Sequence, residues 1–358
     1  MRYNPAHIWQ PYRPTVTGYA LPQRSHLSSF LRRYGTLIGF MAIVLFFWTQ
    51  RPQTFMTLPN WVNITRQMSI LGVVAFTMTI VMVTGDFDLS VGAMASLVGI
   101  VAGSAFQNGG GLGQAVALAL LVGVAGGALN GLLVAGLGIS AFVATLGTLT
   151  VFRGLALYTS GGASIYGRVI PAEFSSFGRG AIVIGELRIP NLTLLAALAL
   201  ALVFVILRFT IVGRRLYAIG GNREAARFGG IRIARLRMLS FVISGLGAAV
   251  AGLMLFSRLS TAHPTQGEGL MLQAIAAVFL GMTMNEEAQP NVLGTLVGVL
   301  ILGVLANGLT QMQIDTYIQQ ILTGVIIILA VTLSSLSQQG LRAPEWLRRL
   351  LPERGEAA

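Results

Sequence analysis

Long runs of apolar residues recur along most of the chain and are separated by short polar segments. Each run is about 17 to 22 residues long, roughly what an α-helix needs to cross a hydrocarbon layer of about 30 Å. Inside lipid, every backbone polar group must find a partner within the protein, and the alternation of polar and apolar residues typical of membrane strands is missing. The pattern therefore predicts an all-α, polytopic membrane helix bundle.

The positions of these runs predict about ten transmembrane helices in two sets of five. The first set comprises Tyr34 to Trp48, Met68 to Thr84, Leu89 to Phe106, Gln114 to Ala135 and Ser140 to Tyr158. The second set comprises Leu192 to Val212, Met238 to Phe256, Met271 to Met284, Val292 to Leu309 and Tyr317 to Leu333.

Arginine is unevenly distributed among the segments between these runs. Five of the 24 arginines lie in residues 1–33, seven in 213–237 and four in 338–358, whereas the opposite side of a ten-span topology holds six. Positively charged loops of membrane proteins face the cytoplasm. We therefore expect two cytoplasmic tails, 1–33 and 338–358, around a transmembrane domain over 34–337, with the loop 159–190 outside.

The composition excludes several kinds of chemistry. Only 10% of the 358 residues are charged, all 24 basic residues are arginine, and there is no cysteine. A P-loop needs a lysine, and disulfides and thiolate nucleophiles need cysteine. The net charge of +12 lies between the apolar runs rather than on a soluble face, so we expect no nucleic-acid partner. The three histidines fall outside the predicted spans, which disfavours an intramembrane enzyme.

A short pattern occurs twice. Gly126-x-x-x-Asn130-Gly131-Leu132 recurs 177 residues later as Gly303-x-x-x-Asn307-Gly308-Leu309. Five spans separate the two copies, so they run in opposite directions, as a possible inverted repeat of two five-helix halves requires. The pattern is short, and a chance match stays open.

The segment from Thr84 to Gly92 places two carboxylates, Asp86 and Asp88, beside the start of an apolar run. Charged side chains next to a membrane span are costly, so they usually have a structural partner or a role in function. Asp88 is predicted to cap the third span by accepting its first backbone amides, because a helix N-terminus favours an anion. A direct role in transport is the alternative.

Polar residues inside the spans are candidates for a solute pathway or for contacts between helices. Asn130 and Asn307 are favoured as hydrogen-bond partners between helices. Arg153 keeps its charge and must face a partner, water or a lipid headgroup. The complete set is Asn130, Thr145, Thr148, Arg153 and Asn307.

The motif Asp88-Leu89-Ser90-Val91-Gly92 resembles the signature of the ribose, xylose and arabinose class of ABC-importer permeases. The similarity extends over most of the chain. It continues in the segments 144–148, 153–156, 218–231 and 293–309. The sequence departs from the pattern at Asp86, where a second glycine is usual, and at 284–289, where an acidic turn replaces a glycine-rich one.

This resemblance implies a permease subunit in the bacterial inner membrane that translocates a monosaccharide or small polyol by alternating access. It also implies the partners: an ABC ATPase that uses ATP, a second permease chain, identical or not, and a periplasmic sugar-binding protein. No cofactor is expected in this chain. The loop 159–190 is the expected docking surface for the binding protein.

Within the loop 213–237, the pattern Glu224-Ala225-Ala226-x-x-x-Gly230 resembles the beginning of the coupling motif of ABC permeases, although the rest of that motif is missing. We expect a short helix there that contacts the ATPase. Small residues allow a close fit, and the alternative is an ordinary positively charged loop. The acidic turn 284–289 is either a solvated loop or a further ATPase contact. The candidate coupling residues are Glu224, Ala225, Ala226, Gly229 and Gly230.

Two other transporter types compete with this interpretation. A secondary transporter would share the inverted repeat, but no predicted span contains a carboxylate that would carry a coupling ion. A branched-chain amino-acid permease is closer in architecture. The motif from Asp88 to Gly92 favours sugars.

Overall fold

The computed structural model describes residues 26–185, 187–284, 288–315, 317–322, 324–326, 328 and 332. It confirms a predominantly helical bundle with a few short strands. The α-helices are α1 (His26–Gln50), α2 (Leu58–Val83), α3 (Val91–Gln107), α4 (Leu112–Gly131), α5 (Ala141–Ser160), α6 (Ala172–Arg179), α7 (Asn191–Phe209), α8 (Ile211–Gly221), α9 (Arg223–Phe228), α10 (Ile233–Leu259), α11 (Glu268–Met282) and α12 (Val292–Gln311). The strands are β1 (Ile165–Tyr166), β2 (Ala181–Ile184), β3 (Leu187–Pro190) and β4 (Thr261–Ala262).

Six helices are long and apolar enough to cross a membrane: α2, α4 with the π-helical turn Leu132–Gly136 that continues it, α5, α7, α10 and α12. Four further apolar helices are shorter: Gly35–Gln50 within α1, α3, α11 and Tyr317–Ile326. All ten overlap predicted runs, although part of the tenth run lies outside the described residues. By length and composition the described helices account for six crossings rather than ten.

α2 begins ten residues earlier than predicted, at Leu58 instead of Met68. Polar residues such as Asn60 and Arg66 suggest a loop before the apolar run. However, Pro59 lies in the first turn of the helix, where its missing N–H is not needed and its fixed φ suits helical geometry. The chain therefore enters the bundle as a helix rather than as a loop.

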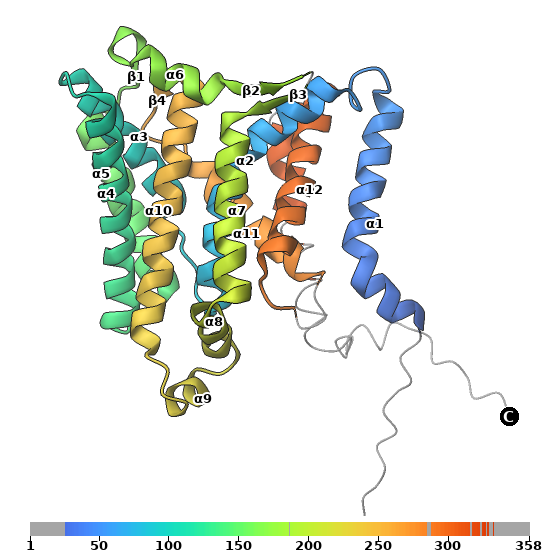
Figure 1. The fold of residues 1–358 in the computed structure, drawn as a ribbon, viewed down its shortest axis with the longest axis vertical. Coiled ribbons are helices and arrows are strands. Elements are labelled where there is room, and N and C mark those ends of the chain that lie inside the picture. Colours follow the sequence, from blue (N-terminus) through green and yellow to red (C-terminus); the bar gives the residue numbers. More distant parts are fainter. Residues whose placement is uncertain are drawn as a thin grey trace, which may run out of the picture.

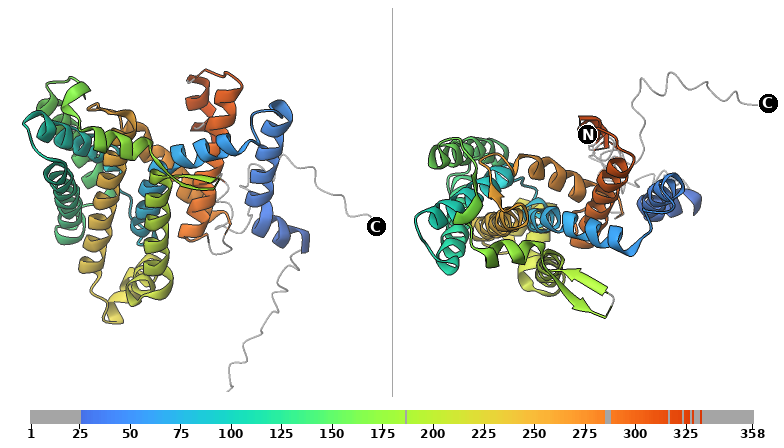
Figure 2. Two further views of the ribbon diagram at one scale, coloured as in Figure 1. Left: turned by 45° about the horizontal axis from the view of Figure 1, so that its top comes forward. Right: turned by 90° about the horizontal axis from the view of Figure 1, so that it is seen from above.

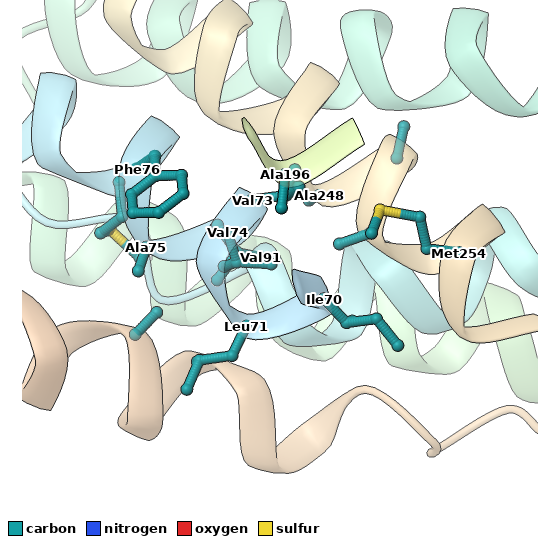
Figure 3. Packing of buried hydrophobic residues seen from close by; sticks show 14 of the residues in the cluster. Ile70, Leu71, Val73, Val74, Ala75, Phe76, Val91, Ala196, Ala248 and Met254 are labelled. Carbon is teal, nitrogen blue, oxygen red and sulfur yellow. The ribbon is translucent and has the colours of Figure 1, made fainter. Parts of the chain in front are cut away.

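The centre of the bundle is α2. Of its most apolar window, 89% is buried, against 22% for α7. Side chains of α2 such as Val73 and Phe76 lie in the main apolar core, and α2 packs against α7, α10 and α12 (Figure 3). The outer helices α5 and α7 instead expose large apolar side chains, as expected for helices in contact with lipid.

The two ends of the bundle carry different structures (Figure 1). At one end lie α6, the antiparallel β2–β3 hairpin and the antiparallel pair of β1 with β4. At the opposite end, α8 and α9 connect α7 to α10, and the N-terminal end of α1 lies on this side. α1 stands at the edge of the bundle, where it contacts α12 (Figure 2).

Glycines bring α4 and α10 into very close contact. A Cβ atom at Gly127 would lie 2.4 Å from the carbonyl oxygen of Phe241, and one at Gly245 would lie 2.3 Å from that of Gly123. α11 and α12 also meet through glycines. With no side chain at these glycines, the helix backbones approach each other directly, as is typical of contacts between membrane helices.

Candidate functional site

The turn that joins α2 to α3 carries both carboxylates, and its polar side chains are buried. Asp86, Asp88 and Ser90 are 4%, 1% and 2% exposed. Gly85 has a φ of +78°, a backbone conformation that favours glycine and turns the chain sharply after α2. A buried carboxylate is stable only when hydrogen bonds or ion pairs replace its lost hydration. Each of the two acids has its own set of partners.

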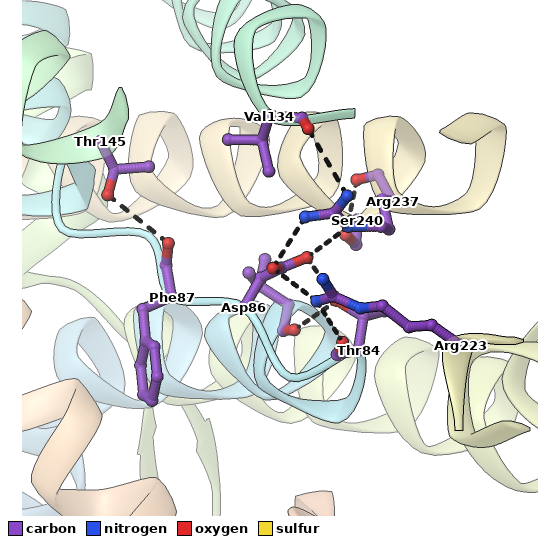
Figure 4. A network of polar contacts seen from close by, with 9 residues as sticks. Thr84, Asp86, Phe87, Val134, Thr145, Arg223, Arg237 and Ser240 are labelled. Atoms are coloured by element: carbon purple, nitrogen blue, oxygen red, sulfur yellow. Dashed lines mark hydrogen bonds and ion pairs between the residues drawn. The ribbon is translucent and has the colours of Figure 1, made fainter. Parts of the chain in front are cut away.

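Asp86 forms ion pairs with two arginines (Figure 4). Arg237 on α10 binds it bidentately, with Nε 2.7 Å from Oδ2 and Nη2 2.9 Å from Oδ1. Arg223, the first residue of α9, places Nη2 2.8 Å from Oδ1 and 3.1 Å from the carbonyl oxygen of Thr84. Bidentate contacts between charged groups are among the strongest hydrogen bonds in proteins. Asp86 therefore joins the turn to α9 and to α10.

Asp88 lies among uncharged donors. Its Oδ1 accepts the amide of Ser90 at 3.0 Å and the hydroxyl of Ser90 at 2.6 Å. Its Oδ2 accepts the hydroxyl of Ser244 on α10 at 2.8 Å. The amide nitrogen of Asn130 on α4 lies 3.4 Å from Oδ1 and donates to the Ser90 hydroxyl at 2.8 Å. Asp88 thus links the turn to α10 and α4.

The contacts of Asp88 differ from the predicted capping of the third span. The amide that Asp88 accepts belongs to Ser90, which precedes the first residue of α3, and no side chain caps α3. The carboxylate instead points to donors on neighbouring helices. Donors from three elements can satisfy more of the carboxylate's acceptor positions than one helix end can. In a buried site this matters, because an unpaired polar group is costly there.

Asn130 extends this network to α5. Thr148 donates to Asn130 Oδ1 at 2.6 Å, and Thr145, one turn earlier, lies 3.5 Å from the carbonyl oxygen of Phe87. The sequence marks four of the network's residues separately, and the structure brings them together. These contacts support a helix-contact role for Asn130. The four residues are Asp88, Ser90, Asn130 and Thr148.

The glycine of the motif, Gly92, lies where α3 meets α11. A Cβ atom there would be 2.6 Å from the carbonyl oxygen of Gly267, which immediately precedes α11. The amide of Gly267 donates to the hydroxyl of Ser96 at 2.9 Å. The N-terminal ends of these two short helices therefore touch, and no larger residue fits at either glycine without a shift of the backbone.

Arg153 and Asn307 lie outside the network. Arg153 on α5 forms an ion pair with Glu268 at the start of α11, with Nε 3.1 Å from Oε1. Half of each side chain is exposed, at 50% and 47%. Asn307 is buried in α12 and accepts a hydrogen bond at 3.2 Å from Gln311, one turn away on the same helix.

The candidate coupling residues lie in and just after α9. Asn222 caps this helix by accepting the amide of Ala225 at 2.9 Å. The chain leaves it through Gly230, whose φ is +77°. Ala226 is buried, whereas Glu224, Ala225, Gly229 and Gly230 are exposed. The tip of α9 also presents the aromatic ring of Phe228, which is 88% exposed.

α8 connects α9 to the rest of the bundle. A Cβ atom at Gly220 would lie 2.0 Å from the carbonyl oxygen of Val83, so α8 packs directly on the end of α2. The hydroxyl of Tyr217 donates to the carbonyl oxygen of Pro290 at 2.9 Å. Burial raises the pKa of Tyr217, although the positive charge of Arg208 acts in the opposite direction. The raised pKa keeps the hydroxyl protonated, so that it can donate. In the acidic turn before Pro290, residues 285–287 lie outside the described residues.

No metal centre competes with this site in the described part of the chain, where no three His, Asp or Glu side chains gather. The polar groups of the site are amides, hydroxyls, carboxylates and guanidinium groups that bind one another. Such an arrangement holds helices in register, and it offers no paired nucleophile and base for catalysis.

Comparison with known proteins identifies the family. Residues 60–331 match the model of a family described as the branched-chain amino acid transport system / permease component. The chain belongs to this permease family. Its members are transport components rather than enzymes, and the resemblance to ABC-importer permeases predicted from the motifs is confirmed.

Several curated relatives align with this family member over nearly their whole length. The ribose import permease protein of Bacillus subtilis (strain 168) is 38% identical over 87% of this chain and 95% of its own. The ribose import permease protein of Escherichia coli (strain K12) is 36% identical over 90% of this chain and 99% of its own. The D-allose transport system permease protein of the same strain is 35% identical over 86% of this chain and 93% of its own. No solved structure matches the chain significantly.

Four contact residues of this permease were not singled out from the sequence. From the sequence, Arg223 and Arg237 count only among the arginines that indicate the membrane topology and supply charge to the loop 213–237. One clue was available for two of these residues: Arg237 and Ser244 are seven positions apart, so they face the same side of α10. The four are Arg223, Arg237, Ser244 and Glu268.

Proposed function

We propose that this chain is the membrane-spanning permease subunit of an ATP-driven, binding-protein-dependent importer of a monosaccharide or related polyol. The observation that carries the proposal is the near-complete alignment with permeases named for ribose and allose. Import of branched-chain amino acids is the alternative, and the description of the family model favours it. The named relatives and the motif from Asp88 to Gly92 favour a sugar.

We infer that the chain crosses the inner membrane ten times, as two inverted five-helix halves. Two observations support this arrangement. α4 packs against α3 and α10, while α12, its counterpart in the second half, packs against α11 and α2. Two of the four shorter apolar helices, α3 and α11, occupy equivalent places in the two halves and meet at Gly92 and Gly267. Interrupted helices in corresponding positions are typical of transporters with inverted repeats.

We infer that both termini and the α8–α9 end face the cytoplasm. The arginine-rich segment 213–237 lies at this end, on the same side as the start of α1 (Figure 1). The opposite end, with α6 and the β2–β3 hairpin, is then outside and offers the docking surface for the binding protein. Since the chain has no lysine for a P-loop, a separate ABC ATPase uses the ATP. Its contact is α9 with the residues that follow it, and no cofactor is needed in this chain.

We infer that the sugar passes along the face of α5 that carries Arg153. An ion pair that is half exposed on an otherwise apolar helix is unfavourable against lipid but not against water or a hydroxylated solute. A second permease chain, identical or not, would close this face into a pathway. Asn130, Thr145 and Thr148 lie behind this face and hold α5 in place.

Arg153→Gln should lower sugar uptake several-fold while the permease stays folded. A half-exposed ion pair contributes only about 0–1 kcal/mol to stability, so the melting temperature should hardly change. Uptake of radiolabelled ribose and thermal unfolding of the purified complex measure the two effects. Arg51→Gln, which removes an exposed arginine outside both the pathway and the loop 159–190, is the control. Normal uptake by the Arg153 variant would exclude this pathway.

Reconstitution tests the proposed function as a whole. Proteoliposomes that contain the permease, its ATPase and the binding protein should accumulate ribose or a related sugar only when ATP is enclosed with the ATPase. Omission of either partner should abolish uptake. Uptake by the permease alone would identify a secondary transporter, and uptake of leucine but not of sugars would favour the amino-acid alternative.

A further inference from the structure

Asp86 occupies the one place where the α2–α3 turn, α9 and α10 meet through charged groups within the described structure. We propose that Asp86, Arg223 and Arg237 form a joint that carries movement of α9 into the helix bundle. The proposal rests on the proposed function, because it takes α9 as the element that the ATPase moves. It assigns these three side chains a positioning role in coupling, and none of them need touch the solute.

The two ion pairs of Asp86 differ in a way that suits a joint. The side chains of Asp86 and Arg237 are 5% and 13% exposed and make a bidentate contact. Arg223 is 47% exposed and touches the carboxylate through a single nitrogen, which it shares with the carbonyl oxygen of Thr84. Buried bidentate pairs hold a fixed geometry, whereas half-exposed single contacts are weak and easily exchanged. Arg237 therefore fixes the carboxylate to α10, and Arg223 forms the movable contact with α9.

The link from α9 into the bundle is short and continuous. Arg223 also donates to the carbonyl oxygen of Thr84, the residue that follows α2. Two residues beyond Asp86, Asp88 bonds to Ser244 on α10 and lies near Asn130 on α4. Because both acids of the turn are buried and bonded, the turn has little freedom to absorb a displacement. A shift of α9 should therefore move the start of α3 and the helices bonded to it.

The charges indicate which substitution tests the joint most cleanly. One carboxylate neutralises two guanidinium groups, so Asp86→Asn would leave Arg237 buried beside the carbonyl oxygen of Val134 without its ion pair. That variant disturbs folding as well as coupling. Arg223→Gln instead removes the contacts of the half-exposed guanidinium group with Asp86 and with the carbonyl oxygen of Thr84, and leaves the Asp86–Arg237 pair intact. Arg51→Gln removes the same charge from an exposed position just after α1, outside the proposed ATPase contact, and is the matched control.

The experiment compares sugar uptake with ATP hydrolysis in complexes reconstituted with the binding protein. For Arg223→Gln we expect uptake per assembled complex to fall about ten-fold while hydrolysis changes less than about two-fold, within the usual range of coupling between sites. Arg51→Gln should keep the ratio of the wild-type complex. The double variant Asp86→Asn/Arg223→Gln should lower uptake no further than Asp86→Asn alone, because the two residues act through one contact.

A second measurement does not depend on sugar transport. Hydrogen exchange of residues 84–90 should change when ATP is added to the wild-type complex and should not change with Arg223→Gln. An unaltered ratio of uptake to hydrolysis, or an ATP-dependent change in exchange that survives in Arg223→Gln, would overturn the joint. A wild-type complex that shows the exchange change but imports no sugar would instead overturn the proposed function and leave the joint standing.

Discussion

Asp88→Leu should greatly reduce the amount of folded permease. The carboxylate of Asp88 accepts the amide and hydroxyl of Ser90 and the hydroxyl of Ser244, and it lies within reach of Asn130. Leucine is similar in size but accepts no hydrogen bond, so up to four donors lose their acceptor. A hydrogen bond between membrane helices averages about 0.6 kcal/mol and a buried unpaired donor costs about 1–3 kcal/mol, which together give a loss of roughly 2–4 kcal/mol.

The free energy of unfolding of a typical protein is only about 5–15 kcal/mol, so a loss of this size is a large part of it. Fluorescence-detected size-exclusion chromatography with a heating step measures it directly. Asp88→Asn, which keeps one oxygen acceptor, should lose less than the leucine variant. Asp315→Leu changes an exposed acid and should be neutral. If Asp88→Leu melts at the wild-type temperature, the network does not stabilise the bundle.

The helical bundle was predictable because apolar length is a local property of the sequence. The joint at Asp86 was not predictable in this way. Asp86 stood out as a departure from the family pattern, but its partners Arg223 and Arg237 are 137 and 151 residues away. Their charges also fit the positive-inside rule. A charge that satisfies a topology rule gives no sign that it is also an ion-pair partner inside the fold.

The network around Asp88 shows the same limit of prediction from sequence. Asp88, Asn130 and Thr148 stand out as polar residues in or beside apolar runs, and Ser90 belongs to the motif from Asp88 to Gly92, which is sufficient to find all four. Their convergence depends on how α4 and α5 pack on the turn, and spacing along one helix does not predict that. The early start of α2 at Leu58 is not predicted, because a polar first turn resembles a loop, although Pro59 favours a helix start.

Gly127→Val should destabilise the permease by about 3 kcal/mol, at the upper end of what overpacking usually costs. A Cβ atom at Gly127 would lie 2.4 Å from the carbonyl oxygen of Phe241 and 2.9 Å from the Cα atom of Val242. Both are backbone atoms of α10, so no side chain can rotate out of the way. α4 or α10 must shift as a unit, and the contacts of Asn130 and Ser244 on these helices with the turn would shift too. Thermal unfolding and sugar uptake should therefore fall together.

Gly147 on α5 provides the matched control, because a Cβ atom there would meet nothing within 4 Å. Gly147→Val should leave the melting temperature almost unchanged. Alanine sharpens the comparison, since Gly→Ala raises helix propensity by up to about 1 kcal/mol wherever space allows. Gly147→Ala should therefore be neutral or stabilising, whereas Gly127→Ala should destabilise. Equal effects at the two positions would mean that backbone conformation rather than the contact between α4 and α10 determines the need for glycine.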